Sequence, residues 1–126
     1  MIPLSEHAEQ VAVCNWLDKT YPGIVYFAVP NGANLGGTDN QRFGQINKLK
    51  AEGLQPGCPD LIIAAARGQY HACALEMKSL KGKLSENQEQ FLARLEEAGW
   101  YTICAHGADE AIEMLSEYFS WQEVKL

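Results

Sequence analysis

Two carboxylates and one amine stand at a spacing that could bind a metal ion and hydrolyse a phosphodiester. Asp60 is followed, after fifteen intervening residues, by Glu76, and Lys78 comes two positions later. The apolar pattern predicts two adjacent strands, residues 60–66 and 70–78. Side chains alternate between the faces of a strand, so Glu76 and Lys78 lie on one face. A hairpin that begins with Asp60 and ends with Glu-x-Lys brings all three groups to the same end of a sheet.

The apolar setting of Glu76 argues for a compensating cation. Alanine, cysteine and leucine precede it, and a carboxylate buried among them is costly unless a cation or a donor compensates its charge. The alternative is a structural pair of Glu76 with Lys78 at a strand edge, but that leaves Asp60 as a coincidence. Few ligands, all of them oxygen, suit Mg²⁺, for which Mn²⁺ would substitute. Lys78 would orient or deprotonate the attacking water, or stabilise the pentacoordinate state.

Eight predicted elements must position these groups. Their order is α-β-α-β-β-α-β-α, and the residues are 6–20, 24–29, 41–52, 60–66, 70–78, 86–98, 100–105 and 108–118. A mixed order with a central hairpin favours an α/β sandwich around a mixed sheet. The strand at 24–29 is expected to be buried, and the Gly- and Asn-rich loop at 31–39 is expected to be mobile. In the second helix, Phe43, Ile46 and Leu49 fall on one face.

Composition limits the class of protein. A length of 126 residues predicts one domain, and the net charge of −6 argues mildly against avid, indiscriminate binding of nucleic acid. The basic residues nevertheless gather in two groups, 42–50 and 78–83. The four cysteines have no metal-binding spacing and are expected to be reduced thiols in a cytoplasmic protein. Neither a membrane span nor a signal peptide is expected.

The Pro-Asp and Glu-x-Lys pattern resembles the motif of the PD-(D/E)xK nuclease superfamily. More of the chain resembles one branch, the VRR-NUC (virus-type replication-repair nuclease) family. The resemblance spans about residues 5 to 118, and the matching stretches are 6–10, 30–32, 49–61, 83–88 and Phe91. It implies a restriction-endonuclease-like α/β/α sandwich with a central mixed sheet and a single VRR-NUC nuclease domain over residues 1–126.

The resemblance also implies roles for particular residues. Asp60 and Glu76 would bind the metal, and the backbone carbonyl of Met77 would complete the protein ligands. Lys78 would be the catalytic lysine. Gln88 matches a glutamine in the helix after the motif and would touch the lysine or the scissile phosphate, although a solvated helix position is an equal alternative from the sequence.

The first helix offers two candidate carboxylates for the same site. Glu6 has the family's spacing to Gln10, four residues later, whereas Glu9 lies nearer the middle of the apolar face. Both remain possible from the pattern, and Glu6 is preferred.

These features predict a magnesium-dependent DNA endonuclease. The resemblance implies action on branched DNA, including junctions like the Holliday junction, in phage or prophage replication, recombination or repair within a bacterial cytoplasm. A homodimer is expected, because a four-way junction has two equivalent strands to cut. The alternative is a non-catalytic nucleic-acid-binding or assembly module, which the intact Asp60, Glu76 and Lys78 argue against. A sequence-reading restriction enzyme is disfavoured because 126 residues leave no evident recognition domain.

Overall fold

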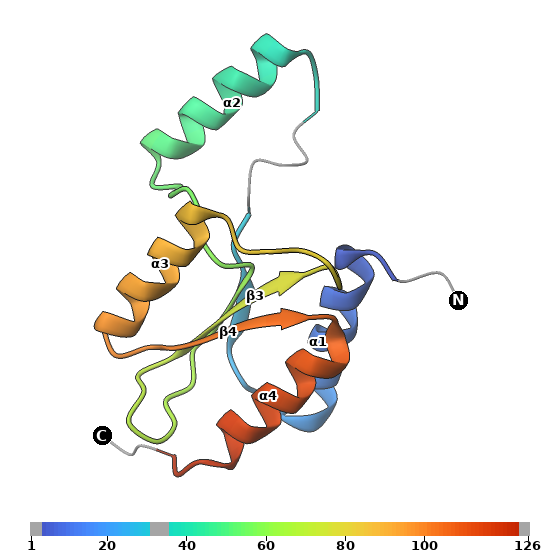
Figure 1. The fold of residues 1–126 in the computed structure, drawn as a ribbon, viewed down its shortest axis with the longest axis vertical. Coiled ribbons are helices and arrows are strands. Elements are labelled where there is room, and N and C mark those ends of the chain that lie inside the picture. The colour runs from blue at the N-terminus through green and yellow to red at the C-terminus, as the bar shows by residue number, and fades with distance from the viewer. Residues whose placement is uncertain (1–3, 31–35, 124–126) are drawn as a thin grey trace.

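The computed structural model describes residues 4–30 and 36–123 (Figure 1). Its elements follow the predicted order, α-β-α-β-β-α-β-α. They are α1 (Glu6–Thr20), β1 (Tyr26–Ala28), α2 (Asp39–Ala51), β2 (Leu61–Ile63), β3 (Cys73–Lys78), α3 (Glu86–Glu97), β4 (Tyr101–His106) and α4 (Ala108–Ser120). No helix within the described residues is long and apolar enough to cross a membrane.

The sheet is mixed, as predicted. Its strands lie in the order β1-β2-β3-β4, with antiparallel pairing from β1 to β3 and parallel pairing between β3 and β4. The predicted hairpin exists, but its paired strands are shorter than predicted. Pairing of β2 with β3 runs only from Leu61↔Leu75 to Ile63↔Cys73. Beyond this pairing, the segments that follow β2 and precede β3 form a loop. They meet again at an isolated bridge between Arg67 and Tyr70.

Helices cover both faces of the sheet. In Figure 1, α1 and α4 lie together on one face and α3 lies on the other. Side chains of β3 at alternate positions join the core under α1 and α4, where the fully buried residues include Val13, Leu17, Cys73, Leu75, Ile103 and Leu115. The intervening positions of β3 therefore face α3. This arrangement is the expected α/β/α sandwich.

The expectation that the first strand is buried was wrong. In the sheet formed by residues 4–30 and 36–123, β1 is an edge strand that pairs with β2 alone. Val25 and Phe27 are 62% and 51% exposed, whereas Tyr26 points inward and donates a hydrogen bond from its hydroxyl to Asp18 at 2.7 Å. An apolar run of this length does not distinguish an edge strand from a central one.

Helix α2 stands apart from this body. It buries no side chain, and Figure 1 shows it projecting away from the sheet. Phe43, on the predicted apolar face, is 68% exposed. The ends of the helix are nevertheless well formed, with a capping box between Thr38 and Gln41 and a closing turn in which Leu54 N–H donates to the Leu49 carbonyl at 2.8 Å. Of the loop expected to be mobile, residues 31–35 lie outside the described part of the chain.

Candidate active site

Asp60 lies where the pairing of β2 with β3 ends. The last paired residues are Leu61 and Leu75, so the next amides of β3 have no partner from β2. Met77 N–H donates instead to Asp60 Oδ2 at 2.7 Å. A carboxylate thus replaces the backbone acceptor at this point, which fixes Asp60 against β3 from seventeen residues away in the chain. The side chain that the sequence singled out is therefore held at the open end of the hairpin.

Glu76 is buried on the face of β3 that looks toward α3. It is 3% exposed, and its Oε1 accepts a hydrogen bond from Gln88 Nε2 at 2.8 Å. Lys78 Nζ lies 3.7 Å from the same oxygen. The other oxygen, Oε2, is buried and has no hydrogen-bond partner among the described residues. A buried carboxylate oxygen without a donor is costly, so this atom is suited to a ligand.

The first turn of α3 orients Gln88 for this contact. Ser85 and Gln88 form a capping box, in which Ser85 N–H donates to Gln88 Oε1 at 2.9 Å and Gln88 N–H donates to Ser85 Oγ at 3.2 Å. Because the amide oxygen is occupied by the cap, the amide nitrogen is directed at Glu76. Gln88 is half-buried and not a solvated helix position.

The environment of these carboxylates disfavours their charged forms. Burial, together with the nearby charge of Asp60, raises the pKa of Glu76 to about 8, and the Lys78 ammonium only partly opposes this. Burial also raises the pKa of Asp60, against the effect of the hydrogen bond from Met77. The negative charges of these two poorly solvated carboxylates are not fully compensated by Lys78. A divalent cation would compensate them.

The structure distinguishes the two glutamates of the first helix. Glu6 Oε1 accepts a hydrogen bond from Ser79 N–H at 3.0 Å, directly after Lys78, and its charge contributes to raising the pKa values of both Asp60 and Glu76. Glu9 Oε2 accepts from Ala108 N–H at 2.5 Å and so caps the start of α4. Glu6 therefore lies beside the candidate site, and Glu9 stabilises the fold.

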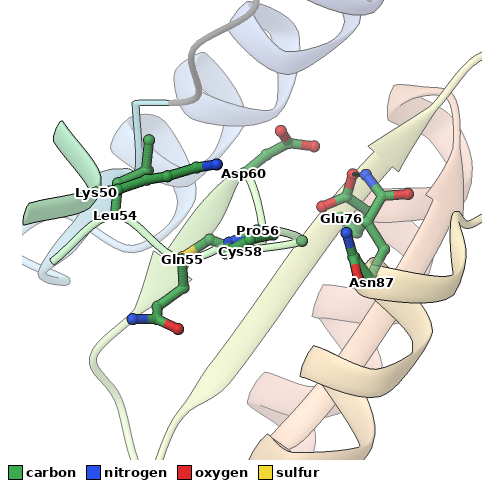
Figure 2. A pocket seen from close by; sticks show the side chains of 10 residues that line it. Lys50, Leu54, Gln55, Pro56, Cys58, Asp60, Glu76 and Asn87 are labelled. Atoms are coloured by element: carbon green, nitrogen blue, oxygen red, sulfur yellow. Dashed lines mark hydrogen bonds between the residues drawn. The ribbon is translucent and has the colours of Figure 1, made fainter. Parts of the chain in front are cut away.

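A cavity of about 350 Å³ opens beside Asp60 and Glu76 (Figure 2). Gln88, which the sequence had assigned to the site, also lines it. The remaining lining residues were not predicted from the sequence: Lys50, Leu54, Gln55, Pro56, Gly57, Cys58 and Asn87. The signal that could have identified them is their place in the stretch before Asp60 and at the start of α3. In the described residues no cluster of three or more His, Cys, Asp or Glu side chains is arranged for a metal. The donors that fit a cation are therefore Asp60 and Glu76, with backbone oxygen and water completing the shell, as Mg²⁺ tolerates.

Gly57 lines this cavity at the point where the turn before Asp60 contacts α3. It has φ +81°, and a Cβ on it would collide with the backbone carbonyl of Asn87 and lie 2.7 Å from Gln88 N. The turn before Asp60 therefore packs directly against the first turn of α3, backbone to backbone. This close approach fixes the distance between the Asp60 segment and the helix that carries Gln88.

Comparison with known proteins agrees with this geometry. The model of the VRR-NUC domain matches residues 5–109. The chain belongs to the VRR-NUC family. A solved structure titled "VRR_NUC domain protein" matches with a TM-score of 0.79 at 24% identity, covering 99% of this chain and 96% of that one, which shows that the two share a fold. No curated protein matches the chain.

Family membership makes this chain a nuclease domain with a restriction-endonuclease-like fold, and a nuclease domain implies a DNA substrate. Nucleases of this family generally use divalent metal ions. The Pro-Asp and Glu-x-Lys residues that suggested the family from the sequence lie together at one end of the hairpin, within the matched region.

Proposed function

We propose that this protein is a magnesium-dependent DNA endonuclease that hydrolyses phosphodiester bonds in branched DNA. The observation that carries the proposal is the buried Oε2 of Glu76, which no described residue contacts as a donor, next to Asp60 in a cavity with room for a cation and a phosphate. A purely structural Glu–Lys pair does not account for a buried carboxylate oxygen that has no donor among the described residues.

Each site residue has a role in this proposal. Asp60 and Glu76, with the Met77 carbonyl, would hold Mg²⁺, which when bound supplies an activated water and stabilises charge on the phosphate. Lys78, held near Glu76, orients or deprotonates the attacking water or stabilises the charge that develops. Gln88 fixes the Glu76 carboxylate through its amide. Glu6 adds a carboxylate beside the turn that follows Lys78.

Metal binding tests the first part of this proposal. Calorimetric titration with Mn²⁺ and with Mg²⁺ should show binding that Asp60→Ala and Glu76→Ala weaken. Asp39→Ala, which removes an exposed carboxylate from α2, is the matched control and should bind as the wild type does. Unchanged binding in both site variants would remove the basis for the metal site.

Cleavage of a DNA panel tests the activity and the substrate. Single-stranded, duplex, flap and four-way-junction DNA should be incubated with the protein, with and without Mg²⁺. We expect cleavage only with the metal, and preferential cleavage of the branched forms. The alternative, a non-catalytic binding module, predicts binding of these DNAs with no cleavage under any metal. The implied setting is phage or prophage replication, recombination or repair in a bacterial cytoplasm, in keeping with four free cysteines.

A homodimer is part of this proposal. Two-fold pairing would supply two sites for the equivalent strands of a junction. Val25, Phe27 and Phe43 are exposed apolar side chains that a partner surface could cover. Sedimentation at micromolar concentration should show a dimer. A monomer that cuts both strands of a junction in one encounter would contradict the dimer and leave the nuclease assignment intact.

A further inference from the structure

Lys50 lies at the candidate active site although it comes from the helix that stands apart. It lines the cavity that contains Asp60 and Glu76, and it is the one cationic residue among the described lining residues. Figure 2 shows its side chain extending over the cavity with the amine directed toward Asp60. Among the described residues it makes no ion pair, whereas Lys78 is engaged with Glu76. The two lysines therefore approach the carboxylates from different elements.

The position of Lys50 is set by the end of α2. No side chain of the helix is fully buried, although Ile46 and Leu49 are partly covered, so packing holds it only weakly. It closes at Gly53, which has φ +113°, and the chain then runs to Gly57, whose backbone abuts the first turn of α3. This short connection carries the last turn of α2 to the rim of the cavity.

Complementing the helix dipole is the simplest alternative role for Lys50. Lysines in the last turn stabilise the negative end of a helix, and α2 has two, Lys48 and Lys50. Lys48 and Lys50 stabilise the helix dipole equally well, because they lie in the same turn. Only Lys50 lines the cavity, so the helix dipole does not account for its position.

We propose that Lys50 binds a backbone phosphate of the substrate strand next to the scissile one. The inference rests on the proposed nuclease function and names a residue that positions its substrate. The cavity wall is acidic, so a strand entering it brings a second negative phosphate toward Asp60 and Glu76. Lys50 offers a mobile point charge on the Asp60 side, while Lys78 lies on the Glu76 side. The strand would then cross the cavity between the end of α2 and the start of α3.

Matched lysine variants test this role. Lys50→Ala and Lys48→Ala remove the same charge from the same helical turn, so they should have the same melting temperature and the same net charge. Loss of a charged hydrogen bond to phosphate should raise KM for Lys50→Ala about ten- to a hundredfold, with kcat nearly unchanged. Lys48→Ala should change KM less than about threefold, and Lys50→Arg should recover most of the affinity.

A substrate change locates the contact. DNA should be prepared with a single neutral methylphosphonate at either phosphate adjacent to the cut. At one of these positions the neutral linkage should weaken cleavage by the wild type as much as Lys50→Ala does. The two changes together should then cost no more than one alone, since they remove the same interaction.

The outcomes separate this inference from the proposed function. The role of Lys50 would be overturned if the effect of Lys50→Ala were strictly additive with that of the methylphosphonate at both positions. It would also be overturned if Lys50→Ala and Lys48→Ala had equal KM values. In either case an active wild type would still support the nuclease function. A wild type that cuts no DNA with Mg²⁺ or Mn²⁺ would overturn both.

Discussion

The two faces of β3 differ sharply although they share one backbone. Toward α1 and α4, Cys73, Leu75 and Met77 are buried among apolar side chains. Toward α3, Glu76 is equally buried, but one of its oxygens has no donor in the described part of the chain, and its pKa is raised to about 8. The six residues of β3 therefore have one face with favourable apolar contacts and one face with a buried carboxylate that lacks a full set of hydrogen bonds.

The apolar face explains how the strand can hold a buried carboxylate. The apolar face contributes the free energy of burial, and the parallel pairing with β4 along the whole of β3 holds the backbone in place. The strand can then keep a carboxylate in an unfavourable setting on the other face. Changes on the α3 face should consequently alter activity, and changes on the α1 and α4 face should alter stability.

The largest effect is expected from Lys78. Replacing it with alanine should lower the cleavage rate on the order of 10²–10⁴-fold, because in the proposed mechanism the lysine would handle a proton or the developing negative charge. Metal and DNA binding should largely survive, and the melting temperature should not fall. Single-turnover kinetics on a junction substrate would measure this, and a fully active variant would show that the Glu-x-Lys match is accidental.

Leu75 provides the opposite case on the apolar face. Leu75→Ala should lower the free energy of unfolding by about 2–5 kcal/mol, because it deletes a fully buried side chain and leaves a cavity. Below its melting temperature the folded fraction should cut DNA at the wild-type rate. Urea unfolding and activity per folded molecule check the two parts. A large rate loss with unchanged stability would contradict the division between the faces.

A dependence on pH is expected from Glu76. Its folded-state pKa is raised to about 8 from an ordinary value of 4.5, so between these values the folded protein retains a proton that the unfolded chain has lost. The metal-free protein should therefore lose stability as pH rises between these two values. Glu76→Gln should flatten this dependence. Melting curves in EDTA at pH 5.5 and pH 8 measure it, and metal added at pH 8 should restore stability to the wild type only.

The smallest effects distinguish the glutamates of α1. Glu9→Gln should cost about 1 kcal/mol, because it weakens the cap of α4, with cleavage unchanged. Glu6→Gln should leave stability within about 0.5 kcal/mol, since the contact to Ser79 is exposed, but should reduce cleavage. Thermal melts and rates for this pair of variants make the comparison, and the reverse pattern would assign Glu9 to the site.

Much of this arrangement could be predicted from the sequence. The signals were local ones. A serine stands before the first turn of α1 (Ser5) and of α3 (Ser85) and caps it, the helices have apolar periodicity, and strand alternation places Glu76 and Lys78 on one face. The exposed edge at Phe27 was missed because an apolar strand does not reveal how many neighbours it has. The place of Lys50 was missed because no pattern within α2 indicates where the end of an unpacked helix lies in space.

The two hydrogen bonds of α1 have a consequence for how the protein is made. Glu6 meets Ser79 across 73 residues and Glu9 meets Ala108 across 99, so α1 is synthesised well before the residues with which these two side chains pair. A growing chain already carries Asp60, Glu76 and Lys78 well before α4 exists to complete the core. The proposed nuclease activity should therefore appear only after synthesis has passed the start of α4.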